Sequence, residues 1–211
     1  SNKKLIGIRD PFGIRPLVIG KLNKSYVLAS ETCALDIIGA KLVREVENGE
    51  IVVITKDGLE SIKPFPKKKP RPCIFEYIYF SRPDSIINNT SVYECRKRLG
   101  AELAKENHVE ADLIIPVPDS GVPAAIGYSC EIKKNVELGI IRNHYVGRTF
   151  IEPTQQIRSL GVKLKHNINK SLIKGKTLIL IDDSLVRGTT SVKIIKMLYE
   201  AGAKEVHVRI A

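Results

Sequence analysis

Thr177-Leu-Ile-Leu-Ile-Asp-Asp-Ser-Leu-Val-Arg-Gly-Thr-Thr-Ser191 is an apolar run that ends in two carboxylates and a turn rich in hydroxyl groups. The apolar residues 178–181 predict a strand that is buried on both faces. Residues 191–201 carry apolar side chains at helical spacing and predict a helix. The turn between them therefore lies at the carboxyl end of a strand, which is where open parallel sheets bind ligands.

This turn combines groups that suit a phosphate, a sugar diol and a hard cation. A helix N-terminus offers unpaired N–H groups and a positive dipole end to a phosphate, and Gly188 lets the backbone come close. Ionised Asp182 and Asp183 can accept hydrogen bonds from vicinal hydroxyls or bind Mg²⁺. The alternative is a strand–turn–helix unit whose aspartates only solvate the edge of a sheet.

The motif Ile181-Asp-Asp-Ser-Leu-Val-Arg-Gly-Thr-Thr-Ser191 resembles the signature of the type I phosphoribosyltransferases, and of the amidophosphoribosyltransferase family in particular. That signature binds 5-phosphoribosyl 1-diphosphate (PRPP). The resemblance implies that the two aspartates contact the ribose hydroxyls and Mg²⁺, and that the turn holds the 5-phosphate. The PRPP-binding residues implied here are Asp182, Asp183, Ser184, Val186, Arg187, Gly188, Thr189 and Thr190.

A second loop, Ile115-Pro-Val-Pro-Asp-Ser-Gly-Val122, also follows an apolar run. Its prolines fix the loop, and Gly121 is expected to open the backbone to an anion. The loop resembles the pyrophosphate loop of the same family, which implies PRPP contacts from Asp119, Ser120 and Gly121 and a Mg²⁺ contact from Ser120. Apart from the resemblance, the segment is a proline-bounded loop ahead of a helix.

Residues 139–158 are cationic and polar after a short apolar start, and they are too long for an ordinary connection. They resemble the loop that closes over bound PRPP in this family. The resemblance implies catalytic roles for Arg142, Tyr145 and Arg148, whereas His144 departs from the basic residue that many relatives have. The alternative is a mobile loop with no catalytic part.

The proline- and lysine-rich run 63–72 divides the chain. Short β-prone runs precede it and predict an α+β part, at residues 17–19, 26–29, 42–46, 51–55 and 59–62. After it, helices are predicted at 91–106 and 122–132, and strands at 113–117, 137–141, 177–181 and 205–210. Because strands and helices alternate there, we expect an α/β domain with a parallel sheet.

The N-terminal part carries a resemblance of its own. The segments 7–17 and 29–35 resemble the later strands of an N-terminal-nucleophile (Ntn) glutaminase domain. We therefore expect an internal fragment in which residues 1–72 are a partial glutamine amidotransferase type 2 (Ntn) domain. Residues 73–211 are then a phosphoribosyltransferase domain that is truncated at its C-terminus. Because the family's nucleophilic cysteine and its oxyanion hole have no match here, we expect no glutaminase activity.

The resemblance implies an amidophosphoribosyltransferase reaction. PRPP and glutamine-derived ammonia would give 5-phosphoribosylamine and pyrophosphate, the first committed step of purine biosynthesis. Two alternatives remain open: a PRPP-binding regulator and a nucleobase salvage phosphoribosyltransferase. The glutaminase-like part argues against both of them.

The composition favours an anionic partner, since 34 Lys+Arg against 23 Asp+Glu give a net charge of +11. The basic runs lack interleaved aromatic residues, so we expect a polyphosphate ligand and no nucleic acid. No apolar run is long enough for a membrane span. We therefore expect no membrane partner, and the widely spaced cysteines favour a reducing cytosol, so a cytoplasmic protein is expected. A homo-oligomer is expected in the full-length form.

The four cysteines show neither zinc-site spacing nor paired motifs. Cys95 and Cys130 fall on apolar positions of predicted helices, so buried thiols are expected. By resemblance, Cys73 matches a position that ligates a 4Fe-4S cluster in some members of the family. Other members keep a cysteine there without a cluster, and the sequence leaves this question open.

Overall fold

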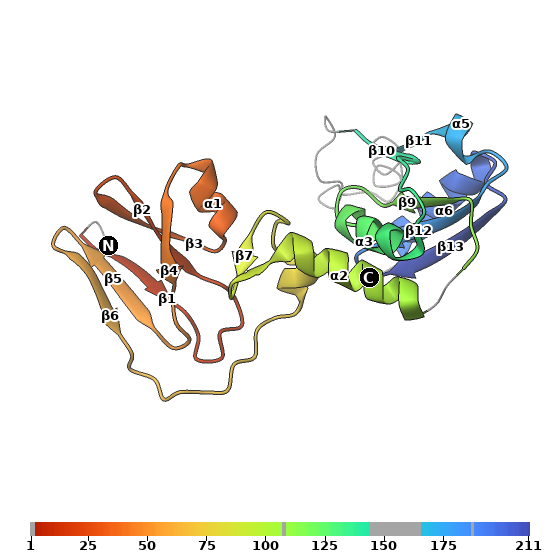
Figure 1. Ribbon diagram of the computed structural model, residues 1–211. Helices are drawn as coiled ribbons and strands as arrows, with labels where there is room; N and C mark the ends of the chain where they lie inside the picture. Colours follow the sequence, from red (N-terminus) through yellow and green to blue (C-terminus); the bar gives the residue numbers. More distant parts are fainter. Residues whose placement is uncertain (1–2, 107–108, 144–165, 187) are drawn as a thin grey trace. The chain divides into compact units, whose positions relative to one another are not determined.

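The computed structural model describes residues 3–106, 109–143, 166–186 and 188–211. The chain divides into two compact units, residues 1–95 and residues 96–211 (Figure 1). None of the helices within the described ranges is long and apolar enough to cross a membrane.

Two three-stranded antiparallel sheets form most of the N-terminal unit, with strand orders β1-β5-β6 and β3-β2-β4. The strands are β1 (Leu5–Ile8), β2 (Val18–Leu22), β3 (Ser25–Ala29), β4 (Lys41–Glu45), β5 (Ile51–Thr55) and β6 (Gly58–Ile62). Strands β2 to β6 overlap the five β-prone runs expected from the sequence. The β5–β6 hairpin closes with Thr55 paired to Gly58.

The two sheets and one short helix pack as layers. Ile19 of β2 is buried in one cluster with Val52 of β5, so it joins the two sheets. Its neighbour Val18 is buried in another cluster with Leu35 of α1 (Thr32–Ile37). Since successive strand residues point to opposite faces, β2 separates α1 from the other sheet. Gly20 makes room for α1, because a Cβ there would lie 2.6 Å from Leu35 Cδ2.

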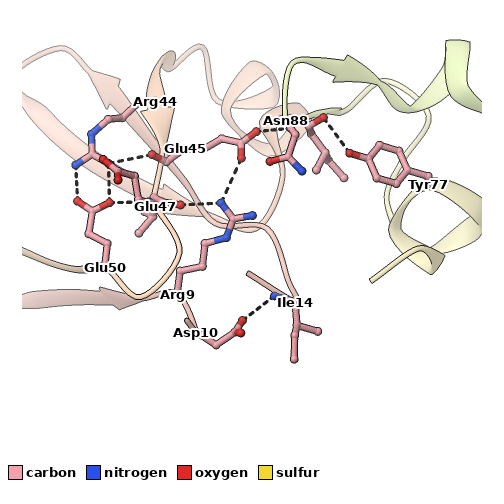
Figure 2. Close-up of polar contacts among 11 residues, drawn as sticks. Arg9, Asp10, Ile14, Arg44, Glu45, Glu47, Glu50, Tyr77 and Asn88 are labelled. Atoms are coloured by element: carbon pink, nitrogen blue, oxygen red, sulfur yellow. Dashed lines mark hydrogen bonds and ion pairs between the residues drawn. The ribbon is translucent and has the colours of Figure 1, made fainter. Parts of the chain in front are cut away.

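A buried carboxylate organises the end of β4 (Figure 2). Glu50 is fully buried, and its oxygens accept hydrogen bonds from Arg44 at 2.6 and 2.8 Å, Ser61 at 2.6 Å and the Glu47 N–H at 2.6 Å. The Arg44 guanidinium is the main cause that lowers the pKa of Glu50 to about 2. Glu50 is therefore a satisfied structural anion.

The N-terminal unit extends past the expected boundary at Pro72. The N–H of Arg71 donates to the carbonyl of Phe12 at 2.8 Å, and that of Cys73 donates to the carbonyl of Ile14 at 3.0 Å. These bonds hold the chain against the loop between β1 and β2, and the compact unit continues to residue 95.

Two carboxylates of the N-terminal unit also bind residues 82–88, in the last part of the same unit. Glu31 accepts hydrogen bonds from the Arg82 N–H at 2.7 Å and from Ser85 Oγ at 2.8 Å, and Glu45 accepts one from the Asn88 N–H at 2.6 Å. This last part of the unit contains the π-helix η1 (Glu76–Phe80) and the hairpin strands β7 (Ile86–Ile87) and β8 (Thr90–Ser91).

A parallel sheet with the order β13-β12-β9 is the centre of the C-terminal unit and confirms the predicted parallel sheet. Its strands are β9 (Leu113–Pro116), β12 (Thr177–Asp182) and β13 (Glu205–Ile210). The helices are α2 (Val92–Glu106), α3 (Val122–Ile132), α5 (Lys170–Ile173) and α6 (Thr189–Glu200). The helix predicted at 122–132 has the bounds of α3.

Strand β12 is buried on both faces, as its apolar run predicts. Leu178 and Leu180 belong to the cluster that includes α6, whereas Ile179 and Ile181 belong to the cluster that includes Tyr128 of α3. Alternate side chains thus bind helices to opposite faces of the sheet.

Two glycines set the distance between α2 and α3. A Cβ at Gly100 of α2 would overlap the carbonyl oxygen of Ala124, and a Cβ at Gly127 of α3 would overlap that of Lys97. Each helix backbone therefore touches the other at a position that has no side chain.

The strand predicted at 137–141 lies outside the parallel sheet, so this part of the prediction is wrong. Only Val136 bridges to β9, through Ile114. The chain then passes Gly139, where a Cβ would lie 2.8 Å from side-chain atoms of both Ile115 and Ile173. After this close passage β10 (Ile140–Arg142) pairs antiparallel with β11 (His166–Ile168) in a separate two-stranded sheet.

Candidate active site

Two predicted ligand loops meet at the carboxyl edge of the parallel sheet. Strands β9 and β12 run side by side with Pro116 opposite Ile181. The Val117 N–H donates a hydrogen bond of 2.8 Å to the Ile181 carbonyl, one residue before Asp182. The loop that follows β9 therefore starts beside the aspartate pair that ends β12, as expected for a site at this edge.

Gly121 fixes the contact between the Ser120 loop and β12. A Cβ at Gly121 would overlap the Ile181 carbonyl oxygen, and its φ of −74° is one that any residue can adopt. The Ala125 N–H donates to the Gly121 carbonyl at 2.9 Å, which begins α3. Gly121 was predicted to open the backbone to an anion, whereas in the structure its missing side chain lets the loop lie against β12.

The two aspartates at the end of β12 are half-buried and close together. The Asp183 N–H donates to the Asp182 carboxylate at 2.9 Å, and the Ser184 hydroxyl donates to that of Asp183 at 3.2 Å. Burial, followed by the hydrogen bond and the charge of Asp183, raises the pKa of Asp182 to about 7. A carboxylate pair with this much uncompensated charge suits a divalent cation or the hydroxyls of a sugar.

The turn after the aspartates leads directly into the N-terminus of α6. Gly188 has a left-handed φ of 68° and precedes the first helical residue, which explains the glycine at this position. Its carbonyl accepts the Val192 N–H at 2.9 Å. Because Gly188 has no side chain to cap the helix, the first N–H groups of α6 are available to a phosphate.

The structure describes most, but not all, of the other residues of this turn that were predicted to bind PRPP. Ser184 and Thr190 are half-buried, whereas the Val186 side chain is 77% exposed. Thr189 is the first residue of α6, and Arg187 lies outside the described residues.

Arg142 lies at the end of β10, where its guanidinium forms an ion pair with the Asp119 carboxylate of the Ser120 loop. The structure thus brings Arg142 to the predicted pyrophosphate loop. The sequence indicated each residue separately but gave no signal for their pairing. Tyr145 and Arg148 lie outside the described residues, so their predicted roles stay predictions.

Cys73 belongs to the N-terminal unit, where it is half-buried. Within the described ranges, no group of three or more His, Cys, Asp or Glu side chains could hold a metal ion. The expected burial of the helical cysteines is wrong for Cys130, which is exposed near the end of α3, and Cys95 is only half-buried.

A phosphoribosyl transferase domain model matches residues 89–211. Amidophosphoribosyltransferase from Rhizobium etli is 59% identical over the whole chain, which covers 44% of that relative. The Synechocystis amidophosphoribosyltransferase is 57% identical over 98% of the chain, which covers 42% of that protein. This chain thus spans less than half the length of these relatives.

Solved structures show the same likeness. The glutamine phosphoribosylpyrophosphate (PRPP) amidotransferase from B. subtilis, complexed with ADP and GMP, superposes with a TM-score of 0.89 and 49% sequence identity. The match covers 99% of this chain and 46% of that chain. From the matched domain and the parallel sheet that carries the two loops, we conclude that the chain belongs to the phosphoribosyl transferase family.

Proposed function

We propose that the chain carries the PRPP site of an amidophosphoribosyltransferase, which forms 5-phosphoribosylamine and pyrophosphate from PRPP and ammonia. The observation that carries this proposal is the meeting of the Asp182–Asp183 turn with the Ser120 loop at one edge of the sheet. The relatives at 52–59% identity bear the name of this activity and support it.

Each part of the site suits one part of PRPP. The N–H groups at the start of α6 suit the 5-phosphate, and the carboxylates of Asp182 and Asp183 suit the ribose hydroxyls. The Ser120 loop and Arg142 suit the leaving diphosphate, since a guanidinium binds phosphate oxygens with two parallel hydrogen bonds.

Mg²⁺ fits this donor set as well. Asp182, Asp183 and the Ser120 hydroxyl are oxygen donors on the two adjoining loops. Burial and then the neighbouring Asp183 raise the pKa of Asp182, and a bound cation would offset both effects. When bound, the ion supplies charge neutralisation for the diphosphate as it leaves. The protein groups hold the ribose and diphosphate in place while the bond at the ribose C1 carbon breaks.

The finer assignments complete the proposal. Tyr145 and Arg148 are proposed to act on the reacting face, and Arg187 to contact the phosphate turn. The N-terminal unit is proposed to be part of an Ntn glutaminase domain, which its two stacked sheets with α1 on one side support. Ammonia would then come from glutamine hydrolysis in a longer, homo-oligomeric protein. We propose no cluster at Cys73 beyond the resemblance already noted.

The test is PRPP binding by calorimetry with and without Mg²⁺. The chain is compared with an Asp182→Asn/Asp183→Asn variant and with Glu110→Gln, a matched change at an exposed glutamate paired with Lys134. We expect the double variant to bind about 100-fold more weakly, since charge-assisted contacts to both hydroxyls and metal are lost. The Glu110→Gln variant should bind like the wild type. Equal affinity of the double variant would contradict the site assignment.

Turnover separates this proposal from the two alternatives. The purified chain, or the longer protein that contains it, should release pyrophosphate from PRPP with ammonium and not with free nucleobases. Consumption of a nucleobase would identify a salvage enzyme. Binding to DNA with a steep salt dependence and no turnover would identify a regulator.

A further inference from the structure

One ion pair joins β10 to the Ser120 loop. Arg142 is the last residue of β10, and Asp119 stands immediately before Ser120 in the loop. The Arg142 Nη1 contacts the Asp119 carboxylate, and the side chains are 34% and 58% exposed. The pair therefore lies at the surface of the proposed diphosphate site, where a ligand can reach it.

The guanidinium of Arg142 is not saturated in this arrangement. Its buried Nε has no hydrogen-bond partner among the described residues, although a guanidinium carries five N–H donors. An unpaired buried donor is unfavourable. An arrangement in which a ligand engages more of these donors would therefore be favoured over the pairing with Asp119.

The strength of the pair suits a contact that is made and broken. Ion pairs with this much exposure contribute little to stability, because water and salt screen them. A diphosphate carries more charge than a carboxylate and offers oxygens for a bidentate contact, so it competes well for a guanidinium. Asp119 can therefore pair with Arg142 and still release it to a diphosphate.

We propose that Asp119 is an internal counter-anion that positions Arg142. In the free protein Asp119 holds the guanidinium at the Ser120 loop, and the diphosphate of the ligand takes its place on binding. Asp119 is thus a positioning residue, which acts through Arg142. This inference rests on the proposed function, because it requires that the loop binds a diphosphate.

The exchange has a measurable consequence. Since the ligand must displace Asp119, an Asp119→Asn change should tighten binding of Mg²⁺-pyrophosphate by about three- to fivefold, near the upper end of what a partly exposed ion pair contributes. Arg142→Gln should weaken binding about tenfold or more, because the charged donor itself is lost. Asp119→Glu keeps the counter-anion and should stay within about twofold of the wild type.

A double-variant cycle by calorimetry tests the inference with inorganic pyrophosphate and Mg²⁺ as the probe. In an Arg142→Gln background, Asp119→Asn should change the affinity by less than about twofold, because there is no guanidinium left to compete for. Glu110→Gln removes an equal charge from another ion pair of the same unit and serves as the control. Thermal unfolding of every variant checks that it folds.

Three results would overturn the inference. Weaker binding by Asp119→Asn would make Asp119 a ligand contact, unchanged binding would remove its role, and an equal gain in the Arg142→Gln background would indicate direct repulsion instead. In each of these cases the wild-type chain still binds PRPP and the proposed function stands. If the wild-type chain binds neither PRPP nor pyrophosphate, the proposed function fails, and this inference fails with it.

Discussion

Two carboxylates of this chain have pKa values that are shifted in opposite directions. Glu50 in the N-terminal unit is fully buried, and its oxygens accept four hydrogen bonds, two of them from Arg44, so its pKa falls to about 2. Asp182 in the C-terminal unit is half-buried beside Asp183, and its pKa rises to about 7. Burial raises the pKa of both groups, but the internal donors outweigh it at Glu50, whereas at Asp182 burial dominates and the second carboxylate adds to it.

The contrast distinguishes a structural anion from a binding anion. A carboxylate whose donors are all internal stabilises the fold and has little left to offer a ligand. A carboxylate that keeps uncompensated charge at a sheet edge destabilises the free protein and gains when a cation or hydroxyl arrives. The lowered pKa thus supports a structural role for Glu50, and the raised pKa supports the proposed ligand-binding role of Asp182.

The largest expected effect comes from Glu50→Gln. This change should destabilise the chain by about 3 kcal/mol at pH 7, because it neutralises a fully buried carboxylate and leaves the half-buried Arg44 guanidinium without its counter-ion. Urea unfolding measures the difference, with Glu60→Gln on the exposed part of the neighbouring strand β6 as the control.

The pH dependence of this variant checks its cause. The folded-state pKa of Glu50 is lowered from 4.5, so its stabilisation is present above pH 4.5 and is lost as the pH falls towards 2. The difference in the free energy of unfolding between the wild type and Glu50→Gln should therefore shrink below pH 4. A difference that stays constant down to pH 2 would indicate that it comes from packing.

Asp182→Asn should have the opposite sign. The folded-state pKa of Asp182 is raised from 3.8 to about 7, so the free wild-type chain loses stability as the pH rises between these values. The shift sets an upper bound of about 4 kcal/mol, and we expect a gain of about 2 kcal/mol for the variant above pH 7. Below pH 4 the two proteins should unfold alike. Destabilisation by Asp182→Asn at pH 8 would show that the carboxylate is structural, like Glu50.

Mg²⁺ should narrow that difference in stability. A cation that binds only the folded chain should stabilise the wild type by about 1 kcal/mol at a concentration several times its dissociation constant. It should leave the unfolding of Asp182→Asn nearly unchanged. Calorimetric melting with 10 mM MgCl₂, and with CaCl₂ at equal ionic strength, gives the comparison. Equal stabilisation of both proteins would assign the ion to another place.

The smallest expected effect tests what raises the pKa of Asp182. Burial is the largest contribution and Asp183 is the second. Asp183→Asn should therefore lower the pKa of Asp182 only part of the way towards 3.8, because the effect of burial remains. Carboxyl-carbon NMR titration would measure it. A return of the pKa to 3.8 would make Asp183 the dominant cause.

Much of the C-terminal unit was predictable because its signals are local. The apolar run before Asp182 predicted β12, and the apolar spacing after Val122 predicted α3. The resemblance indicated both ligand loops, and the parallel register of β9 and β12 explains why they meet. Gly188 was expected to bring the backbone close to a ligand, and its left-handed φ gives an additional reason for a glycine.

The misses involve contacts between segments distant in sequence. Gly139 packs against Ile115 and Ile173, and the chain then pairs with β11 instead of continuing in the parallel sheet; nothing in residues 137–141 signals this. Gly121 is needed because a side chain there would overlap the carbonyl of Ile181, a residue far along the chain. The pairing of Arg142 with Asp119 likewise depends on how β10 leaves the sheet.

The facing glycines of α2 and α3 restrict how this protein can be recombined. Gly100 and Gly127 each accommodate a carbonyl from the opposite helix, so neither helix can be exchanged for one that has a larger residue at its contact position. Because α3 begins at the Ser120 loop, a mismatched α2 would displace the loop as well. A chimera that joins the N-terminal part of one relative to the catalytic part of another should therefore place its junction before α2.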